Sequence, residues 1–250
     1  MIEILTSNAF NTIQDLGRRG KRRFGVSPSG AMDPVALEAG NALLGNDGDA
    51  AGIEVQTFPF RLRFRADMAF ALTGADHDAT LAGRTVPPWW CMRASAGDIL
   101  TIDLPRRGAR VYLALEGGID VPRVLGSRST HLRAGFGGLE GRPLQAGDIV
   151  PVGTARESAS RFDFGAEPPD TAIVAKPAED RVLYVRVMRA GEHDLFSEAM
   201  QATFWSTRGK ISARSDRGGS FDGRQADAGR TGRDALTRGG GWRRAGAAGW

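Results

Sequence analysis

Residues 12–34 form a polar segment whose residue types could bind an anion. Asp15 and Arg18 precede a glycine-rich turn, and Ser29 lies shortly before Asp33, which can cap a helix. Backbone amides at a helix start, next to arginine side chains, favour a carboxylate or a phosphate. The same residues also fit a structural role, in which Asp15 and Arg18 stabilise the turn and Asp33 only caps the helix.

A second segment, residues 115–148, concentrates glycine, arginine, serine and aspartate between two apolar runs. A connecting loop does not need so many glycines, whereas a loop that builds a site often does. Arginine binds carboxylates and phosphates in a bidentate manner, so this segment could orient an acidic or amide substrate. The alternative is a structural loop in which arginines bind backbone carbonyls. The two segments predict a substrate-binding site made of Asp15, Arg18, Ser29, Ser127, Arg128, Ser129 and Arg133, with no catalytic role assigned.

Familiar catalytic and metal-binding motifs are missing from the sequence. It contains no Walker-type loop, GxSxG elbow, HExxH motif or dinucleotide fingerprint. The histidines His77, His131 and His193 lack the spacing of metal ligands, and each is interpreted as a surface or polar-core residue. Of the three, His77 is the least unlikely to be a catalyst, because it lies between Asp76 and Asp78. The single cysteine, Cys91, excludes an internal disulfide framework, and no metal site is predicted.

The elements that must position these residues are mostly short strands. Apolar runs that end at Gly, Pro or Asp lie at residues 2–5, 53–55, 68–73, 99–104, 111–115 and 149–152. Such punctuation is typical of strands and turns. Residues 60–65 alternate strictly, which predicts a strand with three apolar side chains in the core and three arginines in solvent. One helix is predicted after Asp33, with Pro34 in its first turn and Gly45 near its end.

The chain is expected to hold one complete lobe and the start of another. Residues 1–155 form the predicted β lobe, and the polar, proline-bearing residues 156–180 form a linker. A new strand is predicted from Arg181 and a short helix at 194–205. This second lobe, residues 181–216, is too short to enclose its own core.

The charge of the chain resides in its last segment. Residues 217–250 contain seven arginines and three aspartates, which account for the whole formal net charge of +4. The remainder shows no basic footprint, so no nucleic-acid partner is predicted. The composition of this segment predicts disorder. We interpret it as a non-native terminus such as a frameshift product, with an arginine–glycine arm for RNA as the alternative.

The N-terminus gives no sign of export. It lacks the basic start and apolar run of a signal peptide, and no window approaches the ~18 apolar residues of a membrane span. A cytoplasmic protein without a membrane partner is therefore expected.

Four motifs carry a resemblance to a known family. They are QDLGR at 14–18, GVSPSGAMDP at 25–34, LTGAD at 72–76 and GGIDVPRVLGSRSTHLRAGFGGLEGRPLQAGD at 117–148. On these motifs the chain resembles the allophanate hydrolase subunit 2 family, which includes KipA, the C subunit of 5-oxoprolinase and the carboxyltransferase part of urea carboxylase. The resemblance runs from Met1 to about Asp216, where SDRGGSFDGRQ departs from the family's SDRMGYRLEG.

The resemblance implies a mainly β fold with a few helices, made of cyclophilin-like β-barrel lobes of which the second is incomplete. It implies a subunit of an ATP-dependent cyclic-amide hydrolase of the 5-oxoprolinase type, which converts 5-oxoproline to glutamate. The implied partners are a paralogous subunit of the allophanate hydrolase subunit 1 or KipI type and a third 5-oxoprolinase component, with ATP as cofactor. The alternatives are a biotin-dependent carboxyltransferase module that acts on a urea-like amide, and a KipA-like regulatory binding protein.

Overall fold

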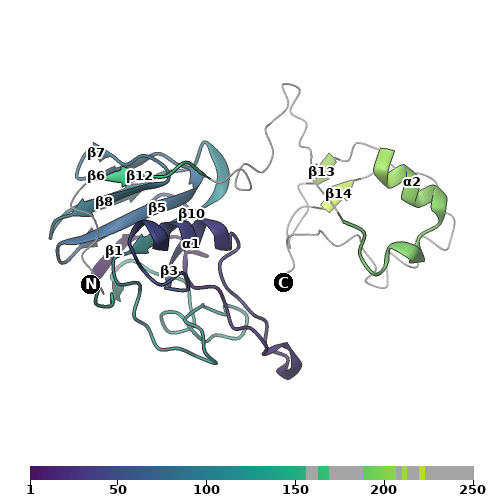
Figure 1. Ribbon diagram of the computed structural model, residues 1–250, viewed down its shortest axis with the longest axis horizontal. Helices are drawn as coiled ribbons and strands as arrows, with labels where there is room; N and C mark the ends of the chain where they lie inside the picture. Colours follow the sequence, from purple (N-terminus) through teal and green to yellow (C-terminus); the bar gives the residue numbers. More distant parts are fainter. Residues whose placement is uncertain (156–162, 169–187, 207–209, 213–219, 223–250) are drawn as a thin grey trace. The chain divides into compact units, whose positions relative to one another are not determined.

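The computed structural model describes residues 1–155, 163–168, 188–206, 210–212 and 220–222. The chain divides into two compact units, Met1–Val174 and Ala175–Trp250, which are described separately (Figure 1). Most of the linker predicted at 156–180 lies outside the described residues, as does most of the strand predicted from Arg181.

The first unit contains two antiparallel sheets of six strands each, and the first sheet has the order β11-β1-β4-β9-β6-β7. Its strands are β1 (Ile2–Thr6), β4 (Phe60–Phe64), β6 (Ala79–Leu81), β7 (Arg84–Thr85), β9 (Ile99–Ile102) and β11 (Ile149–Val150). The alternation predicted for β4 is confirmed, because Phe60, Leu62 and Phe64 are fully buried. Arg63, on the opposite face, contacts Glu3 of β1 at 3.1 Å.

The second sheet has the order β12-β8-β5-β10-β3-β2. Its strands are β2 (Thr12–Gln14), β3 (Gly52–Val55), β5 (Met68–Asp76), β8 (Trp90–Ala94), β10 (Arg107–Leu115) and β12 (Phe164–Gly165). The two longest strands, β5 and β10, pair at the centre, with Tyr112 opposite Thr73 and Leu113 opposite Leu72. The polar segment that follows β2 therefore begins at an edge of this sheet.

A single apolar core joins the inner faces of the two sheets. Ile4 and Leu62 of the first sheet belong to the same buried cluster as Ile53, Leu72 and Leu113 of the second. The expectation of a mainly β fold is confirmed. Within the described residues the strands pair as two separate sheets, and no pairing closes them into a barrel.

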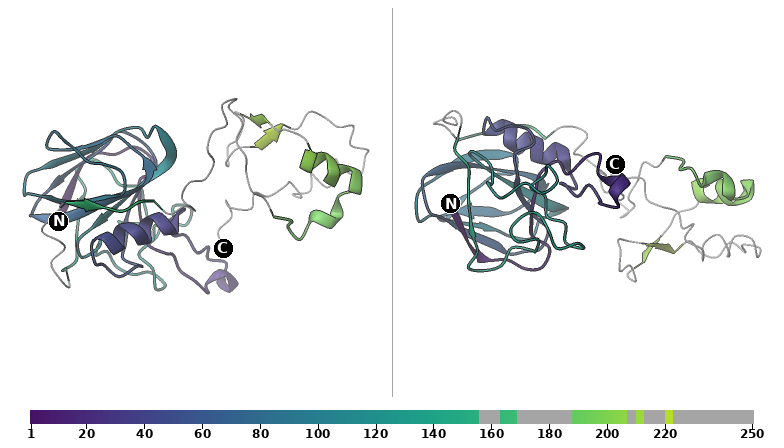
Figure 2. Two further views of the ribbon diagram at one scale, coloured as in Figure 1. Left: turned by 45° about the horizontal axis from the view of Figure 1, so that its top comes forward. Right: turned by 90° about the horizontal axis from the view of Figure 1, so that it is seen from below.

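The helix α1 (Pro34–Leu43) covers the outer face of the second sheet, as Figure 2 shows. Its predicted start is confirmed: the Asp33 carboxylate accepts a hydrogen bond from the Ala36 amide at 3.1 Å, and Pro34 lies in the first turn. The helix backbone approaches the sheet closely, since the Thr73 hydroxyl donates to the Ala36 carbonyl at 2.6 Å. Side chains of β10 alternate between the two faces of the sheet: Tyr112 packs on the outer face, and Val111 and Leu113 belong to the main core.

Long loops occupy the sequence between these elements where the binding residues were predicted. Residues 116–148 contain turns and isolated bridges but no helix or strand, and residues 15–33 contain one short turn of 3₁₀ helix, η1 (Arg22–Phe24). The two loops are joined to the same sheet edge, because the Thr130 amide donates to the Ile13 carbonyl of β2 at 2.9 Å. The fold therefore brings both predicted segments to one place.

The described part of the second unit contains the 3₁₀ turn η3 (His193–Leu195), α2 (Glu198–Ser206), β13 (Lys210–Ser212) and β14 (Ser220–Asp222). The helix predicted at 194–205 is confirmed in large part by α2. Strands β13 and β14 pair antiparallel, so three residues of the segment predicted to be disordered form a strand. The remainder of that segment lies outside the described residues. Among the described residues, no helix is both long and apolar enough to cross a membrane.

Candidate functional site

The Asp15 carboxylate lies at the contact between the two predicted loops and is only 5% exposed. Its Oδ1 accepts hydrogen bonds from the Gly17 amide at 2.7 Å, the Ser127 hydroxyl at 2.7 Å and the Ser129 hydroxyl at 2.5 Å. Its Oδ2 accepts one from the Arg128 amide at 2.5 Å. These four donors satisfy the buried carboxylate, so Asp15 fastens the second loop to the first.

The Arg18 guanidinium is buried beside Asp15, with 2% of the residue exposed. Its Nη2 donates to the Ser129 carbonyl at 2.5 Å, and its Cζ lies 4.9 Å from the centre of the Phe136 ring, a cation–π distance. Nη1 is buried without a hydrogen-bond partner. Burial lowers the pKa of Arg18, and the Asp15 charge acts in the opposite direction.

The structure thus brings together four of the predicted residues, Asp15, Arg18, Ser127 and Ser129. All four are at most 5% exposed, and their polar groups bind mainly one another and the loop backbone. In this arrangement they set the shape of the loops, and a ligand would meet the residues that the loops present outward.

Arg128 is the predicted residue that faces a hollow. Its Nε donates to the Val121 carbonyl at 2.9 Å, and its Nη2 contacts the Asp120 carboxylate at 2.7 Å. The hollow, of about 280 Å³, is also lined by Arg123, which lies 3.7 Å from the Asp49 carboxylate. Two guanidinium groups therefore border a polar depression, although each already has a carboxylate neighbour.

Ser29 and Arg133 lie apart from that buried cluster. Ser29 is half-buried in a left-handed backbone conformation with φ of +53°. Its carbonyl oxygen would be only 2.6 Å from a Cβ placed on Gly17, so the crossing of these chain segments requires glycine there. Arg133 is exposed and makes no ion pair with the residues that the structure describes.

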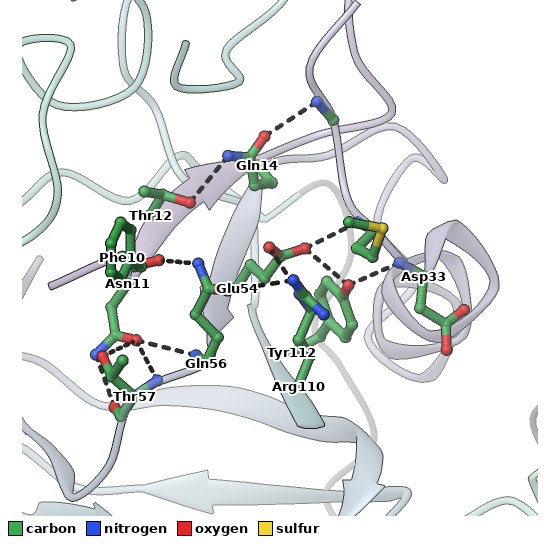
Figure 3. Close-up of polar contacts among 12 residues, drawn as sticks. Phe10, Asn11, Thr12, Gln14, Asp33, Glu54, Gln56, Thr57, Arg110 and Tyr112 are labelled. Atoms are coloured by element: carbon green, nitrogen blue, oxygen red, sulfur yellow. Dashed lines mark hydrogen bonds and ion pairs between the residues drawn. The ribbon is translucent and has the colours of Figure 1, made fainter. Parts of the chain in front are cut away.

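A buried carboxylate in β3 was not among the predicted site residues. Glu54 is 6% exposed, and its Oε2 accepts hydrogen bonds from the Met32 amide and the Tyr112 hydroxyl, both at 2.8 Å (Figure 3). Its Oε1 accepts one from Arg110 Nε at 3.3 Å. The Tyr112 hydroxyl in turn accepts from the Asp33 amide at 2.8 Å. Glu54 therefore holds the end of the first loop against the sheet.

The buried position of Tyr112 beside Glu54 explains why its phenol stays protonated. Burial, followed by the Glu54 charge, raises the pKa of Tyr112 well above its usual value, so the phenol stays protonated and donates. The signal for Glu54 was present in the sequence, since a glutamate between Ile53 and Val55 in a fully buried strand needs partners. The sequence around β3 could not identify these partners, because Tyr112 follows 58 positions later.

The edge of the second sheet carries further polar contacts that shape the first loop. Gln14 of β2 accepts a hydrogen bond from the Gly30 amide at 3.1 Å and donates to the Thr12 hydroxyl at 2.9 Å. Asn11 accepts from the Gln56 and Thr57 amides, both at 3.0 Å (Figure 3). The approach to β2 and the path of the loop are thus both held by side-chain amides.

His77 lies at a different place, in a hollow of about 160 Å³ that Arg106 also lines. The residue is 1% exposed, and neither ring nitrogen has a hydrogen-bond partner. Burial lowers its pKa to about 4, against the opposing charges of Asp76 and Asp78. The imidazole is therefore neutral at pH 7. In the described part of the chain, no group of three His, Cys, Asp or Glu side chains could hold a metal ion.

Comparison with known proteins relates this fold to one family. The chain is 36% identical to the C subunit of 5-oxoprolinase from Escherichia coli (strain K12), over 88% of the chain and 67% of that protein. It is 40% identical to the C subunit of 5-oxoprolinase from Haemophilus influenzae, over the same shares. Among solved structures, the K. lactis urea amidolyase is similar with a TM-score of 0.72 and 29% identity, over 89% of this chain and 14% of that one.

The family model for the carboxyltransferase domain, subdomain A and B, matches residues 24–239. This range extends past Asp216, where the motifs led us to expect the resemblance to end. It includes most of the first unit, the whole second loop and the last part of the first. The chain belongs to the carboxyltransferase domain family, subdomain A and B.

Proposed function

We propose that the chain is a subunit of an ATP-dependent cyclic-amide hydrolase of the 5-oxoprolinase type, which opens 5-oxoproline to glutamate. The observation that carries the proposal is the identity of 36% and 40% to two proteins named as the C subunit of 5-oxoprolinase, over 88% of the chain. The chain spans about two thirds of the length of these relatives. The activity is therefore proposed for a complex with the paralogous subunit of the KipI type and the third component, in the cytoplasm.

The loops at Asp15 support a binding role within that complex. Asp15, Arg18, Ser127 and Ser129 hold the loops, while Ser29, Arg128 and Arg133 belong to the parts that are less buried. Opening a stable lactam requires charge to be stabilised on the amide oxygen, and guanidinium groups and amides can provide this. In this proposed substrate-binding set of seven, Ser29, Arg128 and Arg133 would meet the substrate, and the four buried residues would hold the loops that present them. No one of them is assigned a catalytic step.

ATP would supply the phosphoryl group that activates the lactam oxygen. The described residues of this chain do not fit a phosphate-binding loop of the Walker type, and the guanidinium groups of Arg123 and Arg128 already face carboxylates. We therefore propose that ATP is bound by the assembled complex.

The test is to co-express the chain with the two partner subunits and to measure glutamate released from 5-oxoproline with and without ATP. We expect release that depends on ATP and on the presence of this chain. Arg128→Ala should lower the rate about tenfold or more, because it removes a guanidinium of the proposed substrate-binding set, while the exposed Ser95→Ala should not change it. A complex that assembles and yields no glutamate contradicts the proposal.

A biotin-dependent carboxyltransferase module that acts on a urea-like amide is the second candidate. It is favoured by the name of the matched family and by the similarity to a urea amidolyase at 29% identity. This activity needs a biotin carboxylase and a biotinylated carrier as partners. Supplying a carboxylated carrier and urea distinguishes the two candidates, because only a carboxyltransferase would transfer carbon dioxide to the amide nitrogen without 5-oxoproline.

A further inference from the structure

An exposed serine and a histidine meet where the two loops come together at the surface. Ser27 Oγ lies 3.0 Å from His131 Nε2, across 104 positions of sequence. Ser27 belongs to the first loop and is exposed, and His131 belongs to the second and is half-buried. Neither residue is part of the buried cluster around Asp15. The pair is thus a second contact between the loops, and it is open to solvent.

The backbone near His131 decides which ring nitrogen carries the proton. The Ala134 amide donates to His131 Nδ1 at 3.1 Å, so Nδ1 is an acceptor and the proton of the neutral ring lies on Nε2. Nε2 then donates to Ser27 Oγ. A nucleophilic serine needs the opposite direction, in which the hydroxyl donates to the imidazole. Ser27 Oγ–H is instead left to donate to an acceptor outside the pair.

The imidazole is held in place by an aromatic neighbour. The His131 and Phe136 ring centres are 5.1 Å apart, and the Arg18 guanidinium lies over the same phenyl ring at 4.9 Å. Arg18 is fixed by the Ser129 carbonyl. Because this stack ends on the buried, hydrogen-bonded Arg18, the position of the His131 ring depends on the network that shapes the loops.

The electrostatic environment of the pair favours a negatively charged acceptor. Residues 16–32 contain five Arg or Lys and no Asp or Glu, and residues 121–139 contain three arginines and no acid. Arg19, Lys21, Arg23 and Arg133 make no ion pair among the described residues. Acidic residues flank both stretches, Asp15 and Asp33 at the first and Asp120 and Glu140 at the second, and each of them already has a partner within the chain. The cations that lack such a partner therefore favour an oxyanion at the Ser27 hydroxyl over a cation or a neutral amide.

We propose that Ser27 binds an oxyanion, a carboxylate or a phosphate group, with His131 as the residue that positions its hydroxyl. The inference rests on the proposed function, and it assigns to this surface the acidic group of the substrate or of the nucleotide. Ser27 donates the hydrogen bond to the anion, and the loop cations provide the surrounding positive potential. The site takes no part in a covalent step, because Ser27 cannot pass its proton to His131.

The experiment measures binding to the full-length chain by isothermal titration calorimetry at constant ionic strength. The probes are 5-oxoproline, its uncharged analogue 2-pyrrolidinone, and inorganic phosphate. Ser27→Ala and His131→Phe should each weaken binding of the oxyanion about tenfold, and Ser27→Thr should restore it. His131→Phe keeps an aromatic ring on Phe136 but removes both the N–H that contacts Ser27 and the Nδ1 acceptor of the Ala134 amide, so the Ser27 variants carry the test of the hydroxyl itself. Ser95→Ala, another exposed serine, is the matched control and should bind like the parent chain.

The probes also identify the source of the anion. Weakening of 5-oxoproline binding alone indicates a carboxylate site, and weakening of phosphate binding alone indicates a phosphate site. Binding of 2-pyrrolidinone should be the same in all variants. The proposal is overturned if the chain binds neither oxyanion, or if Ser27→Ala binds them as tightly as the parent. Glutamate release by the assembled complex is measured separately, so failure of the proposed function is distinguishable from failure of this site.

Discussion

At the scale of single residues, the buried Asp15 carboxylate depends on hydrogen-bond donors from both loops. Its carboxylate accepts four hydrogen bonds while 5% exposed. Asp15→Asn turns one oxygen into a donor that faces the Arg128 amide, so a buried donor pair is left unsatisfied. We expect the free energy of unfolding to fall by about 2–3 kcal/mol, measured by urea denaturation.

The matched control for this change is Asp120→Asn. Asp120 also contacts Arg128, at 2.7 Å, but its side chain is 62% exposed. An exposed ion pair contributes about 0–1 kcal/mol, so the control should change stability little. Equal losses in the two variants would contradict the role assigned to Asp15.

His77 makes a second prediction, on the pH dependence of stability. Burial lowers its pKa to about 4 in the folded chain, below the usual value of about 6.5. The unfolded chain therefore binds the proton first, and stability is lost as the pH falls from about 6.5 towards 4. We expect about 3 kcal/mol of loss over this range from His77 alone. The difference between parent and His77→Phe unfolding curves, measured from pH 7.5 to 4, isolates this contribution. A constant difference would contradict it.

At the scale of elements, the crossing of the first loop over itself depends on Gly17. Its φ is +83°, and an added Cβ would lie 2.6 Å from the Ser29 carbonyl oxygen. Gly20 has nearly the same φ, +76°, with nothing within 4 Å of its Cβ position. Both Ala variants incur the cost of a left-handed conformation, about 1 kcal/mol, and only Gly17→Ala adds a clash with backbone. We expect thermal unfolding to show at least about 1 kcal/mol more loss for Gly17→Ala.

Element structure was predictable where it depends on neighbours in sequence. The Asp33 cap, Pro34 and the alternation of residues 60–65 are local patterns, and each appears in the structure as expected. The convergence of the two polar segments could be proposed from composition. The contacts between the segments could not be predicted, because the hydrogen bond from Ser127 to Asp15 spans 112 positions and depends on the path of β2. Sequence patterns could therefore name the loops without showing which side chains they bury.

At the scale of the whole molecule, strand β12 completes the first unit from a distant part of the sequence. Phe164 and Gly165 pair with Cys91 and Trp90 of β8, and Asp163 contacts Arg84 at 3.0 Å. A Cβ on Gly165 would overlap the Trp90 ring, so the strand passes close to that indole. Without β12, strand β8 would become an exposed sheet edge.

This placement predicts a difference between two shortened chains. A chain of residues 1–174 keeps both sheets and the whole main core, so it should unfold cooperatively and at nearly the temperature of the same transition in the full chain. A chain of residues 1–155 keeps the core but leaves Trp90 and the β8 edge uncovered. We expect it to unfold at a temperature lower by several degrees, since a loss of about 1–2 kcal/mol shifts a domain of this size by that amount. We also expect it to associate through the free edge of β8.

Calorimetry and light scattering of the two chains make the comparison. Identical behaviour would show that β12 adds nothing to the first unit, and failure of the longer chain to fold would show that the first unit depends on the residues after 174.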